Sequence, residues 1–171
     1  MTVKPKVVLY NPRAVFYTMP LALIAIASAL DRERIDVVII DGRLEADPIG
    51  AVAAASRDAV CVGITVLTGA PIHDALAVSR AVKAANGSKP IIWGGWHPSL
   101  LASECLDEPS VDIVVTGQGE DTFRHIVDRL IAGESVSGCE SGAMKDLNAY
   151  PAHDYSLIPV EKYFALKGSR Q

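Results

Sequence analysis

Five short apolar runs recur along the first 115 residues, and each is followed by a polar or glycine-containing break and then by a segment that favours a helix. Continuous apolar runs of this length are typical of strands that are buried on both faces of a parallel sheet. Strands that alternate with helices predict an α/β fold, a doubly wound, five-stranded parallel sheet. The predicted strands are residues 7–10, 35–40, 59–64, 91–93 and 111–115.

Helices are predicted between and after these strands, and prolines stand at the starts of three of them. The last predicted helix carries an apolar stripe at helical spacing and ends at Gly133. A flavodoxin-like (Rossmann-like) strand order of 2-1-3-4-5 fits this alternation best. The other predicted helices cover residues 20–30, 49–55, 71–85 and 98–106.

The regular pattern stops after Gly133. Residues 134–171 show no periodicity, and the chain ends without a clear closing element. We therefore predict a first domain over residues 1–133 and an interdomain linker over residues 134–171 that leads to a second domain.

Composition excludes several classes of protein. Half of the residues are hydrophobic, 21% are charged, and the formal net charge is −4 without a basic stripe, which disfavours nucleic-acid binding. The longest apolar run, residues 20–30, is shorter than the roughly 20 residues that a membrane-spanning helix needs. Cys61, Cys105 and Cys139 are far apart and odd in number, so neither a disulfide framework nor a metal site is predicted. A cytoplasmic protein with reduced thiols is expected.

The fourth strand ends in the motif Gly94-Gly95-Trp96-His97-Pro98. Consecutive glycines let another molecule approach bare backbone, and the carboxyl ends of parallel strands are where ligands bind. Two tryptophans beside two glycines would expose apolar area on a surface, so we favour ligand contact over a packed turn. His97 is a weaker candidate, because a histidine next to Pro98 is equally suited to capping a helix.

Three further loops should lie at the same edge of the sheet. Thr65, Val66, Leu67 and Thr68 follow the third strand, and the two hydroxyls can donate to a ligand or simply cap the next helix. Gly117, Gln118, Gly119 and Glu120 follow the fifth strand, where backbone N–H groups favour an anion or a polar ligand edge, or merely form a turn. The loop that follows the first strand, from Asn11, Pro12 and Arg13 through Tyr17, is the remaining wall, and Arg13 is equally compatible with a solvated position.

Several motifs are absent from the sequence. The first strand is not followed by Gly-x-Gly-x-x-Gly, and the chain has no phosphate-binding Gly-x-x-x-x-Gly-Lys-Ser/Thr or Gly-x-Ser-x-Gly elbow. The acidic residues of a phospho-receiver are replaced by Asn11 and Thr65. No catalytic residue is predicted, and a large, mostly apolar ligand fits better than a reaction centre.

These loops resemble the cobalamin-binding domain at the N-terminus of cobalamin-dependent radical S-adenosylmethionine enzymes. Thr65-Val66-Leu67 is similar to the Ser-x-Leu element of the broader cobalamin-binding fold, and Gly94-Gly95 is similar to its glycine pair. Gly-Gly-x-His-Pro at residues 94–98 and Gly-x-Gly-Glu at 117–120 resemble the radical-enzyme branch, as does Tyr150-Pro151-Ala152 in the tail.

The resemblance implies that cobalamin is the cofactor, that Thr65 hydrogen-bonds its displaced dimethylbenzimidazole, and that the Gly94-Gly95 pair lets the nucleotide tail pass. Asn11-Pro12-Arg13 stands where the family's Asp-x-His-x-x-Gly supplies the lower cobalt ligand, so no histidine from this loop should bind cobalt. Replacing Gly95 with Leu should then abolish cobalamin binding and leave the fold intact.

The cluster motif Cys-x-x-x-Cys-x-x-Cys is absent, so the [4Fe–4S] cluster and S-adenosylmethionine are expected only in a C-terminal radical domain of a longer parent. The parent would be a methyltransferase, or a cyclase similar to the magnesium-protoporphyrin monomethyl ester cyclase. Two alternatives remain open: a flavodoxin-like nucleotide- or phosphate-binding regulatory domain, and a module that binds nothing without its second domain.

Overall fold

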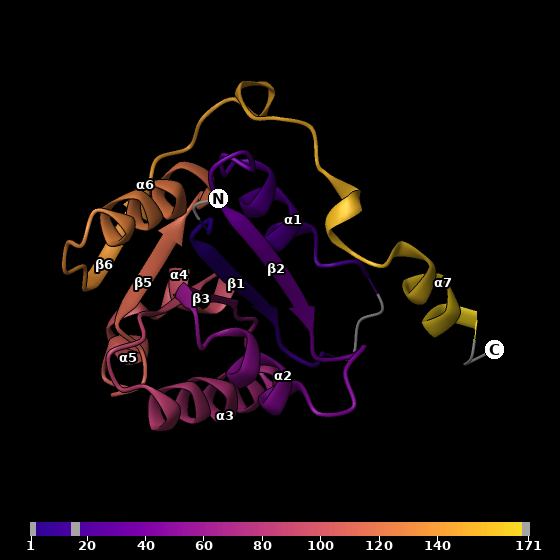
Figure 1. Ribbon diagram of the computed structural model, residues 1–171, viewed down its shortest axis with the longest axis horizontal. Coiled ribbons are helices and arrows are strands. Elements are labelled where there is room, and N and C mark those ends of the chain that lie inside the picture. The colour runs from indigo at the N-terminus through magenta and orange to yellow at the C-terminus, as the bar shows by residue number, and fades with distance from the viewer. Residues whose placement is uncertain (1–2, 15–17, 169–171) are drawn as a thin grey trace.

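The computed structural model describes residues 3–14 and 18–168 and contains one parallel six-stranded sheet of order β2-β1-β3-β4-β5-β6 (Figure 1). All five pairings are parallel, and Thr65 at the end of β3 lies opposite Gly94 at the end of β4. The strands are β1 (Lys6–Asn11), β2 (Asp36–Asp41), β3 (Ala59–Thr65), β4 (Ile91–Gly94), β5 (Ile113–Gly117) and β6 (Gly138–Gly142).

Helices cover both faces of the sheet, as the doubly wound prediction requires (Figure 1). On one face, α1 and α6 pack against the sheet, and on the other face α2, α3 and α5 do. The helices are α1 (Leu21–Ser28), α2 (Pro48–Ala55), α3 (Ala70–Ala85), α4 (Trp96–Leu100), α5 (Ala102–Leu106), α6 (Glu120–Ile131) and α7 (Val160–Gly168), with short 3-10 turns η1 (Leu147–Ala149) and η2 (Tyr155–Leu157).

The central strands are buried on both sides, which explains their continuous apolar sequences. In β1, Val7 and Leu9 pack in the core under α1 and α6, whereas Val8 and Tyr10 pack in the core under α2 and α3. All four side chains are at most 1% exposed. An apolar residue at every position is therefore needed, because both faces of the strand exclude water.

The sheet has six strands, so the prediction of five is wrong. The additional strand, β6, pairs with β5 from Ile113 opposite Gly138 to Gly117 opposite Gly142. Its sequence, Gly-Cys-Glu-Ser-Gly, has no β-branched or large apolar residue, and its side chains are exposed or half-buried. An edge strand of this kind is held by backbone hydrogen bonds, which leave no apolar pattern in the sequence. The sheet thus continues past Gly133.

The single helix predicted over residues 98–106 is two helices. Leu101 separates α4 from α5, because its backbone (φ −134°, ψ 53°) departs from helical geometry. Leu101 N–H still donates a 3.1 Å hydrogen bond to the carbonyl oxygen of His97 in α4.

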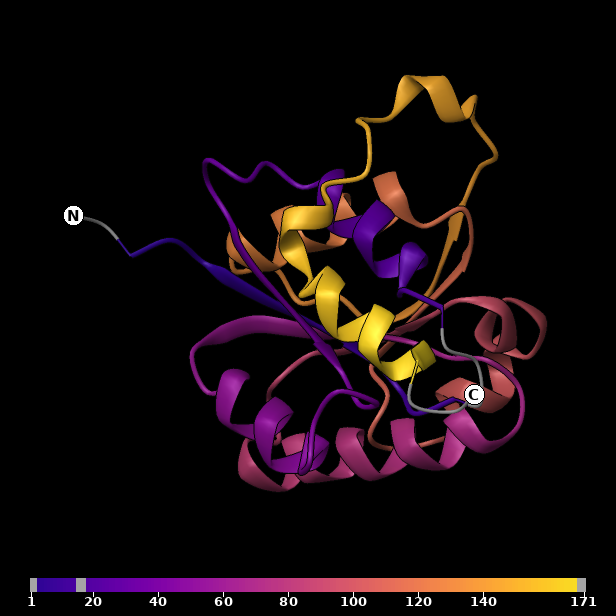
Figure 2. The ribbon, with the colours of Figure 1, turned by 90° about the vertical axis from the view of Figure 1, so that its right-hand side faces the viewer.

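The tail after β6 arches over α1 and α6 and returns to the end of β2 (Figures 1 and 2). Ile158 and Tyr163 are buried there against Ile24 of α1. The aperiodic tail predicted from the sequence is therefore folded against the domain. Whether residues 134–171 also connect to a second domain remains a prediction.

Within residues 3–14 and 18–168, no helix is long and apolar enough to cross a membrane. Over the same part of the chain, no three His, Cys, Asp or Glu side chains gather in a way that could hold a metal ion.

Candidate ligand-binding groove

A cavity of about 520 Å³ opens at the carboxyl ends of β3, β4 and β5, between α1 and α6. Gly63, Ile64, Ile92, Gly94 and Val115 form its floor. Apolar side chains of α1 and Phe123 of α6 form its sides. The cavity is a mainly apolar groove, open enough to admit an elongated ligand.

Gly94 leaves space in the floor that a side chain would occupy. A Cβ placed on Gly94 would lie 3.7 Å from the carbonyl oxygen of Val115, which is an ordinary van der Waals contact. The backbone of Gly94 does not adopt a positive φ. Nothing in the fold therefore demands a glycine at this position, whereas a ligand that lies against bare backbone would.

Gly95 is a glycine for a different reason. Its φ is +96°, and a Cβ there would lie 2.8 Å from Oγ1 of Thr65 and 3.2 Å from the backbone nitrogen of Val66. The loops after β3 and β4 are tied together at this point, because Val66 N–H donates to Gly94 and His97 N–H donates to Val66. Gly95→Leu would therefore strain the backbone and collide with Thr65 whether or not a ligand binds, so Gly94 is the position that tests the groove.

The groove has few polar groups. Thr65, Ser99, Gln118 and Glu120 are among its lining residues. The hydroxyl oxygen of Ser99 accepts a 3.1 Å hydrogen bond from Gly117 N–H, which joins the loops after β4 and β5. Within residues 3–14 and 18–168, the side chain of Thr65 makes no hydrogen bond, and Thr65 lines the groove.

Eight of the predicted site residues come together in the groove. They are Thr65, Gly94, Gly95, Trp96, Gly117, Gln118, Gly119 and Glu120. The loops after β3, β4 and β5 therefore converge as their place at the strand ends predicts.

Val66, Leu67, Thr68 and His97 lie beside the groove and do not line it. Val66 is buried in the opposite core, and Leu67 is partly exposed. The hydroxyl of Thr68 lies 3.2 Å from Nδ1 of His97, so these two side chains contact each other. His97 is thus part of the loop that surrounds the groove.

The described part of the loop after β1, residues 12–14 and 18–20, does not line the groove, and residues 15–17 lie outside the part of the chain that the structure describes. Asn11 Nδ2 donates to Asp41, the backbone N–H of Arg13 donates to Asp74, and Arg13 Nε donates to the carbonyl oxygen of Gly42. Pro12 is buried. Asn11 and Arg13 are hydrogen-bonded near the ends of β1 and β2, and these three residues do not form a wall of the groove.

The sequence did not predict that α1 and the tail after β6 form walls of the groove. Ala22, Leu23, Ala25 and Ile26 of α1 line the groove, as do Met144 and Leu147 after β6. One signal was available, because residues 21–27 are apolar on every side of the helix. A surface helix that covers one face of a sheet needs only one apolar stripe, so an all-apolar helix indicates a second apolar neighbour.

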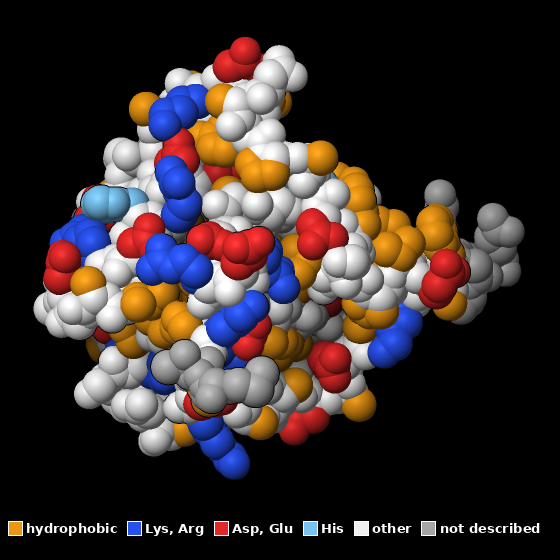
Figure 3. All heavy atoms as spheres, turned by 45° about the horizontal axis from the view of Figure 1, so that its top comes forward, with side chains coloured by type: hydrophobic (Ala, Val, Ile, Leu, Met, Phe, Trp, Pro, Cys, Tyr) orange, Lys and Arg blue, Asp and Glu red, His pale blue; other side chains and the backbone are white. Residues whose placement is uncertain are grey.

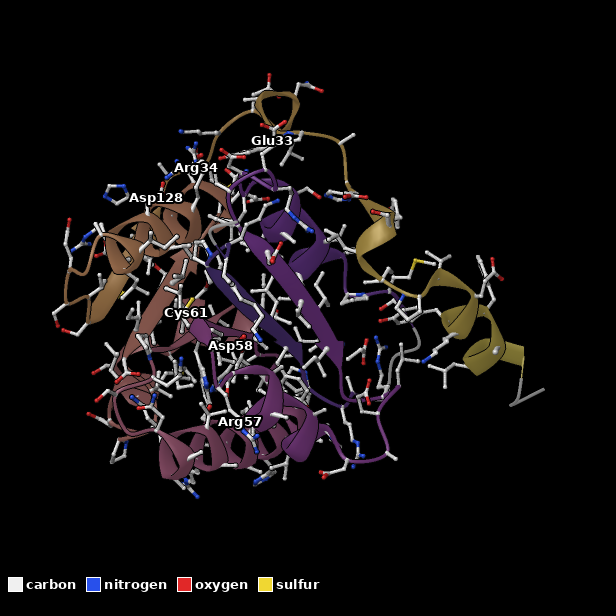
Figure 4. The ribbon with its side chains drawn as sticks, viewed as in Figure 1. Glu33, Arg34, Arg57, Asp58, Cys61 and Asp128 are labelled. Atoms are coloured by element: carbon white, nitrogen blue, oxygen red, sulfur yellow. The ribbon has the colours of Figure 1, made fainter. Side chains whose placement is uncertain are left out.

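Charged side chains are mixed in sign on the face that Figure 3 shows, and basic residues do not form a continuous stripe there. The labelled residues Glu33, Arg34, Arg57 and Asp58 lie on the loops that precede β2 and β3, at the amino ends of these strands (Figure 4). The groove lies at the opposite, carboxyl edge.

An α/β domain with an apolar groove across glycine-containing strand ends belongs to the class that holds a large cofactor at the carboxyl edge of a parallel sheet. Residues 7–127 match the family described as the B12 binding domain. The chain belongs to this family, and it is a cobalamin-binding domain. The cofactor prediction is confirmed, and the nucleotide- or phosphate-binding alternative is not supported.

A curated relative, the uncharacterized methyltransferase PH0819 of Pyrococcus horikoshii, is 34% identical over 167 residues. The match covers 85% of this chain and 35% of the relative, so the chain spans about a third of that protein's length.

Two solved structures of the radical S-adenosylmethionine methyltransferase TsrM from Kitasatospora setae share the fold. One, with cobalamin and a [4Fe–4S] cluster bound, has a TM-score of 0.67 at 20% identity and covers 78% of this chain and 26% of that chain. The other, with tryptophan and a S-adenosylmethionine analogue, has a TM-score of 0.66 and covers 77% and 27%.

Proposed function

We propose that this chain is the cobalamin-binding module of a radical S-adenosylmethionine enzyme and that its groove receives the nucleotide tail of the cofactor. The observation that carries the proposal is the open floor at Gly94, where an added Cβ would make only ordinary contacts inside a cavity of about 520 Å³. A flat heterocyclic base and its ribose need such a slot between the sheet and two helices.

The residues around the groove fit this cofactor. The hydroxyl of Thr65 would hydrogen-bond the dimethylbenzimidazole base, and the apolar side chains of Leu23, Ile26 and Phe123 would cover its faces. The loop after β1 offers no histidine, and Arg13 is held by the carbonyl oxygen of Gly42. Cobalt would therefore receive no lower ligand from this loop.

The proposed parent carries a radical domain after this module, with a [4Fe–4S] cluster and S-adenosylmethionine. The relative that is 34% identical is described as a methyltransferase, and the structural neighbour TsrM is a radical S-adenosylmethionine methyltransferase. Methyl transfer is thus the favoured reaction of the parent. Ring closure, as in the magnesium-protoporphyrin monomethyl ester cyclase, is the second candidate on the motifs alone.

The test is a titration with hydroxocobalamin, followed by desalting and visible absorption. We expect this chain, or a chain extended past Gln171, to retain cobalamin at a near-stoichiometric ratio. Gly94→Leu should lose the chromophore because its side chain fills the slot. Gly87→Leu is the matched control, because Gly87 follows α3 far from the groove and its Cβ would meet nothing closer than 3.9 Å.

Two results would overturn the proposal. Retention by neither polypeptide would reject cobalamin binding by this module. Unchanged retention by a folded Gly94→Leu variant would reject the placement of the nucleotide tail. In the reduced cobalamin complex, a spectrum without nitrogen coordination is expected, since the loop after β1 supplies no histidine.

A further inference from the structure

The segment between β6 and α7, residues 143–159, forms an arch that joins these two elements (Figure 2), and we call it the strap. Met144 and Leu147 belong to the strap and line the groove. Their side chains are nevertheless 85% and 73% exposed. Two large apolar side chains that border a cavity and still face water form an incomplete wall, which a bound molecule would complete.

The strap is tied to the domain on both sides of the groove. At α6, Lys145 Nζ pairs with Asp121 at 2.5 Å, and the hydroxyl of Tyr150 donates to the same carboxylate at 3.1 Å. At α1, the backbone N–H of Asp154 donates to Oγ of Ser28 at 2.9 Å. These ties hold Met144 and Leu147 at the rim without burying them.

Gln118 links the strap to the groove. Its Oε1 accepts a 2.6 Å hydrogen bond from the backbone N–H of Lys145. Because that N–H can only donate, the atom that faces it must be the oxygen, and this fixes the orientation of the amide. Gln118 is also a lining residue of the groove.

The other end of the same amide lacks a partner. Among the described residues, Nε2 of Gln118 is one of few shielded side-chain atoms without a hydrogen bond. A shielded donor without an acceptor is unfavourable, and native structures usually satisfy such groups with a residue, a water or a ligand. Because Gln118 belongs to the wall of the groove, a ligand acceptor that displaces the groups shielding this nitrogen would satisfy it.

We infer that Gln118 couples the strap to the bound cofactor: Oε1 holds Lys145, Nε2 donates to an acceptor atom on the nucleotide tail, and Met144 and Leu147 close over that tail. This inference rests on the proposed function. Both hydrogen bonds need the same orientation of one amide, so ligand binding and strap closure stabilise each other. Gln118 is then a binding residue specific for the nucleotide part of cobalamin.

Cobinamide, which has the corrin ring but lacks the nucleotide tail, separates this role from general folding. Gln118→Glu keeps an acceptor for Lys145 N–H and removes the donor. We expect its dissociation constant for cobalamin to rise about tenfold, as loss of one well-placed hydrogen bond implies, and its dissociation constant for cobinamide to stay unchanged. Equal weakening of both ligands, or no weakening of either, would overturn the inference.

Hydrogen exchange of residues 143–150 supplies a second readout. Cobalamin should slow exchange in this part of the unmodified chain, and cobinamide should not. Gln118→Glu should lose the cobalamin-dependent protection and keep the protection seen without ligand. Exchange that does not respond to cobalamin while cobalamin is bound would reject the strap alone, whereas absence of cobalamin binding would reject the proposed function as well.

The apolar part of the strap has its own matched pair of variants. Leu147→Ser should speed release of cobalamin and not of cobinamide. Phe164→Ser in α7 removes a comparably exposed apolar side chain that does not line the groove, and it should change neither rate. Identical behaviour of the two variants would contradict closure of the strap over the nucleotide tail.

Discussion

The hydroxyl of Tyr163 in α7 donates a 2.9 Å hydrogen bond to Oδ2 of Asp41 at the end of β2, 122 residues earlier in the chain. The same carboxylate accepts hydrogen bonds from Arg43 and Asn11. Burial raises the pKa of Tyr163 above its ordinary value, and the nearby Asp41 raises it further, so the phenol stays protonated and able to donate. The tail is therefore fastened to the sheet by a buried polar cluster.

Tyr163→Phe tests this fastening. The ring packing against Ile24 stays, and only the hydrogen bond is lost. We expect a decrease of about 1 kcal/mol in the free energy of unfolding, measured with urea. Tyr155→Phe is the control, because Tyr155 is 45% exposed and its substitution should change stability little. Equal effects of the two substitutions would contradict a stabilising role for the bond.

Asp41→Ala should have a larger effect. Arg43 pairs with Asp41 at 2.6 Å, and both side chains are less than a tenth exposed. Removal of the carboxylate leaves a buried guanidinium without its counter-charge, at a cost of about 3–5 kcal/mol. The double variant Asp41→Ala/Arg43→Met should recover part of this loss in the same urea experiment.

A more exposed ion pair, Arg80 with Glu108, serves as the comparison for the buried pair of Asp41 and Arg43. Arg80 and Glu108 also pair at 2.6 Å, but Arg80 is 62% exposed. Glu108→Ala should therefore cost less than about 1 kcal/mol. A loss as large as that of Asp41→Ala would show that burial does not distinguish the two pairs.

Substitutions of two left-handed glycines separate backbone strain from collision. Gly69 has a φ of +108° and open space around its would-be Cβ, whereas Gly95 has a φ of +96° and Thr65 Oγ1 at 2.8 Å from that position. Gly69→Ala should cost about 1 kcal/mol for the backbone alone. Gly95→Ala should lower the melting temperature further, and a melting temperature equal to that of Gly69→Ala would contradict the collision.

The pH dependence of the free energy of unfolding should report the ion pair between Asp121 and Lys145, which anchors the strap to α6. Lys145 lowers the pKa of Asp121 by donating a hydrogen bond to it, and Tyr150 lowers it further. A lowered carboxyl pKa stabilises the folded state above the unfolded pKa of about 4, and the stabilisation is lost as the pH falls through the folded pKa. The difference in unfolding free energy between this chain and Asp121→Asn should be constant from pH 7 to about pH 5 and shrink below pH 4. A difference that does not vary with pH would reject the anchor's charge dependence.

The three thiols should differ in reactivity. Cys61 lies inside the sheet, and burial raises the pKa of its thiol to about 12 (Figure 4). Cys105 is also buried, and Cys139 on β6 is exposed. A thiol reagent such as Ellman's should therefore label one group quickly in the folded protein and two more only in denaturant. Cys139→Ser should remove the fast phase, and a fast phase that persists would contradict the exposure of β6.

The strands β1 to β5 and the glycine loops could be predicted because their causes are local. A strand buried on both faces must be apolar at every position, and this pattern is visible in β1 and β3 without knowledge of their neighbours. Parallel strands all end at one edge, so Thr65, Gly94 and Gly117 were expected to converge and do so in the groove.

The remaining features depend on partners that are distant in the chain. The pairing of β6 uses backbone groups and exposed polar residues, which carry no apolar pattern. The loop with Asn11 and Arg13 turns away from the groove because Asp41 and Gly42, about 30 residues later, supply its hydrogen bonds. The contacts of Gln118 with Lys145 and of Tyr163 with Asp41 likewise join segments with no shared periodicity. Five of the six strands and the edge at which their glycine loops converge follow from local sequence patterns. The side chains that wall the groove do not, because they come from segments that meet only after the sheet has formed.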